Sequence, residues 1–371
     1  MLIKLFQKIS HAQALSIVLM ILVAITSAHF LFTGSRVSNA STAIASKYLG
    51  VYYDLELTKR VYSIEWGALI PDEHREIEVY VQNEGAEPLC PSLATDNWTP
   101  ADAPSYLRFS WSSDKTWIKP GEVTTVTQSL HVSSGIKKVL NFSFDILFQA
   151  RNYLIMEDFV SLFAENPKAK MIYPSLNSPK PLNCSAAMVS DWTASAFIFT
   201  KLSNATEGLD IEANFVDPTT GKVHGDIGTG IVTFGGPIVN PVVKYAESVS
   251  TIESDQAPIR FHDQDGIYSF QQRNGSDIPG TSLPTTVINS NQDMFVIEIY
   301  RDTAGRYIML CYGFGWKGTY AAGKYFDTLI YPDLNSHTES WIVVKWDDTN
   351  GDGFVNTSKD GDTYTVISKG N

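Results

Sequence analysis

The chain has 371 residues, of which 44% are hydrophobic and 18% charged, a composition typical of globular domains and too apolar for a disordered chain. Its formal net charge at pH 7 is -12, and no cluster of Lys and Arg interrupts it. Because each phosphate contact needs a basic side chain, this balance excludes nucleic acid as a partner. The length allows two or three domains, each with its own core.

The first 33 residues have the features of an export signal. Lys4 and Lys8 precede an apolar run that extends from Ala12 to Phe32. The run matches the ~20 residues that span a bilayer, which predicts a retained N-terminal membrane helix. The small residues 26–28 also allow a cleaved signal peptide, and this alternative stays open. With the positive charges on the cytoplasmic side, residues from 50 onward are expected outside the cell, on the membrane or secreted.

Asn-x-Ser/Thr sequons occur seven times, where about three are expected by chance for this composition. The excess favours an exported glycoprotein, although Asn-rich turns next to Ser and Thr would also produce sequons. The predicted acceptors are Asn39, Asn97, Asn141, Asn183, Asn204, Asn274 and Asn356.

Residues 34–48 are small and polar, which predicts a short Ser/Ala-rich stalk. Beyond it, apolar and polar residues alternate with a period of two in EIEVYVQ, YLRFSW and NFSFDILF, and the last segment places Asn141 on the solvent side. One-sided alternation interrupted by turns is typical of antiparallel sheets with one buried face. Residues 49–149 are therefore predicted to form a β-sandwich of immunoglobulin size.

The motifs of this segment resemble an immunoglobulin-like domain that is common in archaeal membrane-anchored surface proteins. That family has a W-G-x-L-x-P-G-S motif before a strand ending in N-E-G, and a later P-G-E motif. The matching residues are Trp66-Gly67, Leu69, Pro71, Asn83-Glu84-Gly85 and Pro120-Gly121-Glu122, with Asp72-Glu73 in place of Gly-Ser. The resemblance covers most of residues 49–149 and implies a fold and a location, without any chemistry.

Residues 150–371 mix strand and helix patterns and are predicted to form a mixed α/β domain. Two stretches in it run strand, glycine turn, helix. One is the apolar run 230–234 followed by Gly235-Gly236-Pro237, and the other is the run 306–312 followed by Gly313-Phe314-Gly315-Trp316-Lys317-Gly318. The second satisfies the G-x-G-x-x-G pattern of dinucleotide-binding loops.

A nucleotide is nevertheless not expected at either loop. A nicotinamide fold needs a second βαβ half, and too little chain follows the second loop to form one. Trp316 and Lys317 would place bulk where a pyrophosphate binds, and the first loop lacks the Lys and Ser/Thr of a P-loop. We interpret the glycines sterically: they let each helix turn back tightly onto its strand.

The same stretches are similar to a region of archaeal S-layer and S-layer-like proteins. There, a G-G-P-x-x-N element precedes a strand that ends in glycine and a helix with small residues, which in this chain are Thr319, Ala321 and Ala322. The resemblance covers roughly residues 225–356. It implies a surface-layer or surface-associated protein without catalytic activity.

A candidate calcium loop at 348–360 follows the apolar segment WIVVKW. Oxygen-bearing residues at loop positions 1, 3, 5 and 9 and a glycine at position 6 match the front of a calcium-binding loop. The predicted ligands are Asp348, Asn350, Asp352, Phe354 through its backbone carbonyl, and Asn356. Position 12 is Lys359 instead of Glu, so Asp360 or Asp362 would have to complete the shell. A plain hairpin turn is the alternative, because Asn-Gly and Asp-Gly are strong turn dipeptides.

Signatures of hydrolases and zinc proteases, G-x-S-x-G and H-E-x-x-H, do not occur in the sequence. The leading interpretation is a non-enzymatic, S-layer-like cell-surface glycoprotein of archaeal type, anchored by its N-terminal helix and contacting other surface proteins or glycans. The first alternative is a module that binds polysaccharide or a cell-wall polymer, with Trp98, Trp192 and Trp316 as stacking surfaces. The second is a secreted hydrolase with a pair of carboxylates.

Overall fold

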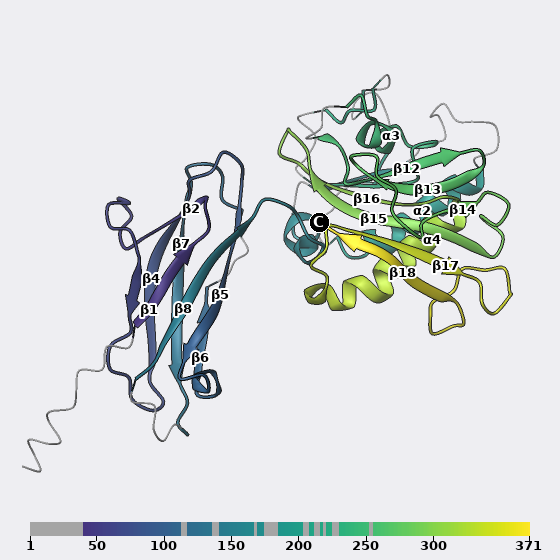
Figure 1. The fold of residues 1–371 in the computed structure, drawn as a ribbon. Coiled ribbons are helices and arrows are strands. Elements are labelled where there is room, and N and C mark those ends of the chain that lie inside the picture. Colours follow the sequence, from purple (N-terminus) through teal and green to yellow (C-terminus); the bar gives the residue numbers. More distant parts are fainter. Residues whose placement is uncertain are drawn as a thin grey trace, which may run out of the picture. The chain divides into compact units, whose positions relative to one another are not determined.

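The structure is a computed structural model, and it describes residues 40–112, 117–135, 141–166, 169–173, 185–202, 208–210, 216–217, 220–224, 230–251 and 255–371 (Figure 1). The predicted leader, residues 1–33, lies outside these ranges. Within them, every helix is too short or too polar to cross a membrane. The chain forms two compact units, Met1–Asn152 and Tyr153–Asn371. The described residues are mostly β-sheet with few helices, consistent with the expected all-β domain followed by a domain that mixes strands and helices.

The first unit contains two four-stranded sheets that share one core. One sheet has the order β3-β1-β8-β5, with β1 at Ala40–Ala45, β3 at Ser63–Glu65, β5 at Cys90–Thr99 and β8 at Ser143–Arg151. The other has the order β2-β4-β7-β6, with β2 at Leu49–Tyr52, β4 at His74–Asn83, β7 at Val123–Val132 and β6 at Leu107–Trp111. A 3-10 turn, η3, occupies Ala103–Ser105.

The predicted alternation is confirmed in the burial of these strands. In β4, Val79 and Val81 are buried between exposed or half-exposed polar neighbours, and in β8 Phe144, Ile146 and Phe148 face the same core. Period-two burial on one face of each sheet is what holds the two sheets together.

The predicted stalk at 34–48 is wrong for residues 40–45, which form β1. This strand pairs in parallel with β8 and antiparallel with β3. The side chain of Ser41 is fully buried, and its hydroxyl accepts the indole N–H of Trp66 at 2.8 Å. Strand pairing and the buried contact of Ser41, and not a flexible tether, therefore define this segment.

The second unit is organised around a seven-stranded sheet with the order β10-β9-β11-β16-β15-β17-β18. Its strands are β9 Ala169–Tyr173, β10 Gly208–Asp210, β11 Gly230–Phe234, β15 Gln292–Arg301, β16 Tyr307–Gly313, β17 Trp341–Asp347 and β18 Thr363–Gly370. The first four in the sheet order are mutually parallel, and β15, β17 and β18 add antiparallel pairs. A second, three-stranded sheet consists of β12 Ile259–Gln264, β13 Ile267–Gln272 and β14 Leu283–Pro284.

The large sheet is covered on both faces (Figure 1). On one face, the core includes Val242 and Val243 from α3 (Pro241–Glu247) together with Ile259 and Phe270 of the small sheet. On the other, α4 (Trp316–Tyr325) contacts β15 and β16 and packs against α2 (Ser185–Phe199). Shorter helical turns are η4 Met156–Asp158, η5 Val160–Ala164, η7 Phe326–Ile330 and η8 Tyr331–Ser336. Strands β15 and β16 are consequently buried along almost their whole length, as expected for a sheet between two layers.

Candidate functional site

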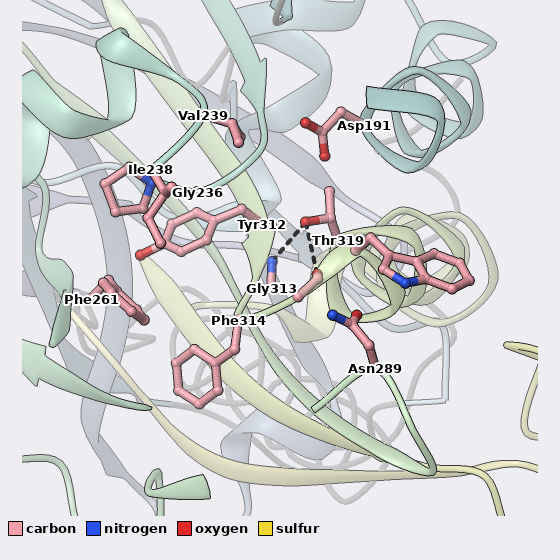
Figure 2. Close-up of a pocket in the computed structure, with 13 residues that line it drawn as sticks. Asp191, Gly236, Ile238, Val239, Phe261, Asn289, Tyr312, Gly313, Phe314 and Thr319 are labelled. Carbon is pink, nitrogen blue, oxygen red and sulfur yellow. Dashed lines mark hydrogen bonds between the residues drawn. The ribbon is translucent and has the colours of Figure 1, made fainter. Parts of the chain in front are cut away.

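The two glycine loops lie side by side at one edge of the large sheet. Strands β11 and β16 are parallel neighbours, with Phe234 opposite Cys311, so both loops leave the sheet at the carboxyl ends of their strands. Together they line a cavity of about 200 Å³ (Figure 2). The carboxyl edge of parallel strands is where open α/β sheets bind ligands.

The cavity also takes residues from three other elements. Its lining comprises Asp191, Gly236, Pro237, Ile238, Val239, Phe261, Asn289, Tyr312, Gly313, Phe314, Gly315, Trp316 and Thr319. Asp191 comes from α2, Phe261 from β12, and Asn289 from the loop before β15. Sequence reasoning treated the two glycine loops separately and missed that they form one cavity.

The steric interpretation of the glycines is confirmed. A Cβ added at Gly313 would lie 2.3 Å from the carbonyl carbon of Gly318, because α4 turns back directly over the end of β16. A Cβ at Gly236 would come within 3.0 Å of the Tyr312 ring. A contact well below 3 Å with backbone would force the chain apart, so the turn at Gly313 requires glycine, whereas at Gly236 the Tyr312 ring would have to shift slightly.

The N-terminus of α4, where a dinucleotide phosphate would bind, is capped by side chains of the chain itself. Asp293 Oδ1 accepts the Gly315 N–H at 3.2 Å, and its Oδ2 accepts the Gly318 N–H at 3.0 Å. Asn289 Oδ1 accepts the Lys317 N–H at 3.0 Å. The free N–H groups of a helix N-terminus are what attract anions, so this arrangement opposes a phosphate at the G-x-G-x-x-G turn.

Asp293 is fully buried, and burial raises the pKa of its carboxyl group to about 7 against the opposing effect of the backbone N–H groups. Its position in the mostly apolar strand segment QDMFVIEIYR was the available sequence signal, since an acid in a buried strand needs partners.

The turn after β11 is held by Asn240, the residue that precedes α3. Its Oδ1 accepts the Val242 N–H at 2.9 Å, and its Nδ2 donates to Thr233 Oγ1 and to the Phe234 carbonyl at 2.7 Å each. This is an N-cap that also joins the helix to its own strand. It fixes the wall of the cavity formed by residues 236–239.

A pair of buried glutamates lies behind the aromatic wall of the cavity. Glu247 accepts the Tyr312 hydroxyl and, at 2.9 Å, the Phe261 N–H, whereas Glu298 accepts the Ile259 N–H at 2.9 Å. Burial raises the pKa of Glu247 to about 8. Burial, together with the charge of Glu247, raises the pKa of Glu298 well above its ordinary value. These hydrogen bonds attach β12 to the large sheet.

The two glutamates do not line the cavity. Among the described residues that do, Asp191 is the one that carries a carboxylate. The pair of facing carboxylates that a glycosidase requires is therefore not assembled by the described lining.

The structure brings the five predicted calcium ligands together in the loop between β17 and β18, but their polar groups bind within the loop. Asp348 accepts the N–H groups of Gly351 and Gly353 at 2.8 and 2.9 Å. Asp352 Oδ2 accepts the side-chain amides of Asn350 and Asn356 at 3.0 and 2.7 Å. In this form the loop is a self-capped hairpin connection, the alternative considered above.

Two lysines of α4 contact the same loop. Lys317 Nζ donates to the carbonyl of Gly353 at 2.7 Å, and Lys324 Nζ donates to that of Val355 at 2.5 Å. Gly353 and Val355, which provide these carbonyls, stand on either side of Phe354, whose side chain is exposed. In the parts of the chain that the structure describes, no three acidic, histidine or cysteine side chains gather in a geometry suited to a metal ion. Calcium stays a prediction.

The predicted glycosylation sites fall into three groups. Asn97, Asn141 and Asn274 are exposed, whereas Asn356 is half-buried and its amide nitrogen is bonded to Asp352. The remaining predicted acceptors, Asn39, Asn183 and Asn204, lie outside the described residues. The acceptor nitrogen of Asn97 is also engaged, since its Nδ2 donates to Asp145 Oδ2 at 2.7 Å.

The three tryptophans proposed as stacking surfaces differ in position. Trp98 is half-buried and stacks on Phe144 with ring centroids 4.0 Å apart, so it belongs to the core of the sandwich. Trp192 on α2 is 40% exposed and does not line the cavity. Trp316, 37% exposed, lines it.

Comparison of the sequence with protein-family models and with curated proteins finds no match.

Proposed function

We propose that the protein is a non-enzymatic, S-layer-like cell-surface glycoprotein of archaeal type, with a structural or adhesive role. Its N-terminal segment is a membrane anchor or an export signal. The immunoglobulin-like sandwich and the mixed α/β unit lie outside the cell, where they contact other surface proteins or surface glycans.

The observation that carries this proposal is the exposure of Asn97, Asn141 and Asn274. These sequons occur in both units. The side chains of Asn141 and Asn274 are open to a glycosyl transferase, whereas the Asn97 amide donates to Asp145 Oδ2 at 2.7 Å. The self-capped N-terminus of α4 adds support, because it uses internally the groups that would make the glycine loop a phosphate site.

Membrane fractionation of the full chain in an archaeal host, followed by glycan staining, tests the proposal. We expect the protein in the membrane or secreted fraction, with a stained band. Asn97→Gln, Asn141→Gln and Asn274→Gln should each increase its mobility on a gel. Asn335→Gln alters an exposed asparagine outside any sequon and should leave mobility unchanged. Protein found free in the cytosol and without sugar would overturn the proposal.

The alternative of a polysaccharide-binding module gains support from one feature, the position of Trp316 on the wall of the cavity. A surface protein that carries such a site would combine a structural with a binding role.

A further inference from the structure

The cavity between the two glycine loops has two chemically different sides (Figure 2). Asp191, Thr319 and Asn289 supply polar groups, while Tyr312, Phe314 and Phe261 lie toward the other side. This separation distinguishes the cavity from a plain apolar gap in the core, which would be lined by aliphatic groups alone.

The volume limits the size of the occupant. Pockets that enclose drug-sized molecules measure about 300–1,000 Å³. At about 200 Å³, the cavity is too small for a nucleotide and suits one six-membered ring with its substituents.

The electrostatics of the lining exclude an anion. The Asp191 side chain is 1% exposed and stands at the edge of the first glycine turn, where a Cβ on Gly235 would lie 2.5 Å from Asp191 Oδ2. The N–H groups at the start of α4, which would attract a phosphate or carboxylate, are bonded to Asp293 and Asn289. The lining thus contains a carboxylate, and the N–H groups that could bind an anion are already bonded. This combination favours a ligand that donates hydrogen bonds, such as one with hydroxyl groups.

Aromatic side chains supply the complementary surface. Phe314 packs edge-to-face with Phe261, and their ring centroids are 5.9 Å apart. Trp316 stands at the first residue of α4 and keeps 37% of its side chain exposed beside the cavity. An aromatic ring packs well on the apolar C–H face of a sugar, whose hydroxyl groups remain free for the polar side.

We propose that this cavity binds a single residue of a neutral glycan. Asn289 meets the hydroxyl groups on the polar side, where the buried Asp191 carboxylate supplies negative charge behind the surface, and Trp316 stacks on the exposed face of the ring at the mouth. Gly236, Gly313 and Gly315 let the chain turn tightly at the wall, because a Cβ at each would meet Tyr312, Gly318 or Asn289, respectively. This binding activity does not depend on where the protein is located in the cell.

The test is binding of methyl glycosides of glucose, galactose, mannose and N-acetylglucosamine to the full chain, measured by saturation-transfer NMR and calorimetry. A detergent without a sugar headgroup keeps the leader soluble. We expect saturable binding of at least one neutral glycoside and none of glucuronate or inorganic phosphate. Failure of all the neutral glycosides to bind, or tighter binding of an anion, would overturn the proposal.

Variants locate the site. Trp316→Ala should weaken binding at least about tenfold, the loss expected when an aromatic anchor is truncated. Ile238→Trp places a large ring on an exposed position of the lining and should abolish binding while the unfolding temperature is retained. Trp192→Ala is the matched control, because it removes a similarly exposed indole outside the lining. Equal effects of Trp316→Ala and Trp192→Ala would refute the assignment. Fractionation in cells tests the surface location, and glycoside binding by the purified protein tests the cavity. A negative result in one experiment therefore leaves the other proposal standing.

Discussion

The carboxylate of Asp293 lies 3.0 Å from the backbone nitrogen of Gly318, across the turn that joins β16 to α4. Asp293 lies on β15, and it caps α4, the helix that follows the neighbouring strand β16. In a nucleotide-binding fold a phosphate would take this place, so the contact opposes a phosphate at this glycine pattern.

Replacing Asp293 by Asn should lower the free energy of unfolding by about 1–3 kcal/mol. The amide offers one oxygen where the carboxylate uses two, so a buried N–H of Gly315 or Gly318 would face an NH₂ group. Urea unfolding of the full chain followed by tryptophan fluorescence measures the change. Asp265→Asn, at an exposed turn, is the control and should stay within about 0.5 kcal/mol. An Asp293→Asn protein as stable as the wild type would show that this cap is dispensable.

Stability should decrease as pH rises from about 4 to about 8. Burial raises the pKa of Asp293 to about 7 and that of Glu247 to about 8, so the native state binds more protons than the unfolded state at intermediate pH. The contribution of these two carboxyl groups to the free energy of unfolding is fully present below about pH 4 and is lost as pH rises through 7 and 8. Unfolding measured at about pH 5.5 and about pH 8.5 checks the sign, with the lower free energy expected at the higher pH.

The variant Glu247→Gln isolates one part of this pH dependence. Its neutral amide retains an acceptor for the Phe261 N–H and cannot ionise. The difference in stability between the two pH values should shrink relative to wild type. An unchanged difference would mean that Glu247 does not titrate in this range.

Ser41→Ala should destabilise the sandwich by about 1–3 kcal/mol, because it leaves the buried indole N–H of Trp66 without its acceptor. If residues 40–45 were a tether, the change would have no effect. Ser110→Ala, on the exposed side of β6, is the matched control. Thermal unfolding monitored by circular dichroism compares the two variants.

Calcium, if it binds the loop at 348–356, should raise the unfolding temperature in a concentration-dependent way, because a ligand of the native state stabilises it by mass action. Asp352→Asn retains an oxygen for the Phe354 N–H and removes the charge, so it should abolish the calcium response. Because the variant also places an NH₂ group where Oδ2 accepts from Asn350 and Asn356, each protein is compared with its own unfolding temperature in the absence of calcium. Magnesium serves as the control cation. An unfolding temperature that is insensitive to millimolar calcium would leave the loop as a self-capped hairpin.

Much of the fold was predictable because its signals are local. The alternation in β4 and β8 follows from the two faces of a strand, and the bounds of β11 and α3 follow from an apolar run, a glycine turn and Asn240 as the cap. The sequence misled at residues 40–45, because a Ser/Ala-rich segment is compatible with both a tether and a strand. Only the buried partner, Trp66, distinguishes them.

The candidate site could not be read in the same way. The two glycine loops are far apart in the chain, and no local pattern states that β11 and β16 are parallel neighbours. Asp191 and Asn289 carry no motif and reach the cavity only through the packing of α2 and the loop before β15.

By itself, the sequence determined where strands and glycine turns occur and which side chains need burial, because periodicity and turn chemistry act between residues close in the chain. The tertiary structure decided that the two turns enclose one cavity and that a carboxylate, not a ligand, satisfies the start of α4. Those outcomes depend on the order of strands in the sheet, which is set by the joint burial of apolar faces contributed by distant segments.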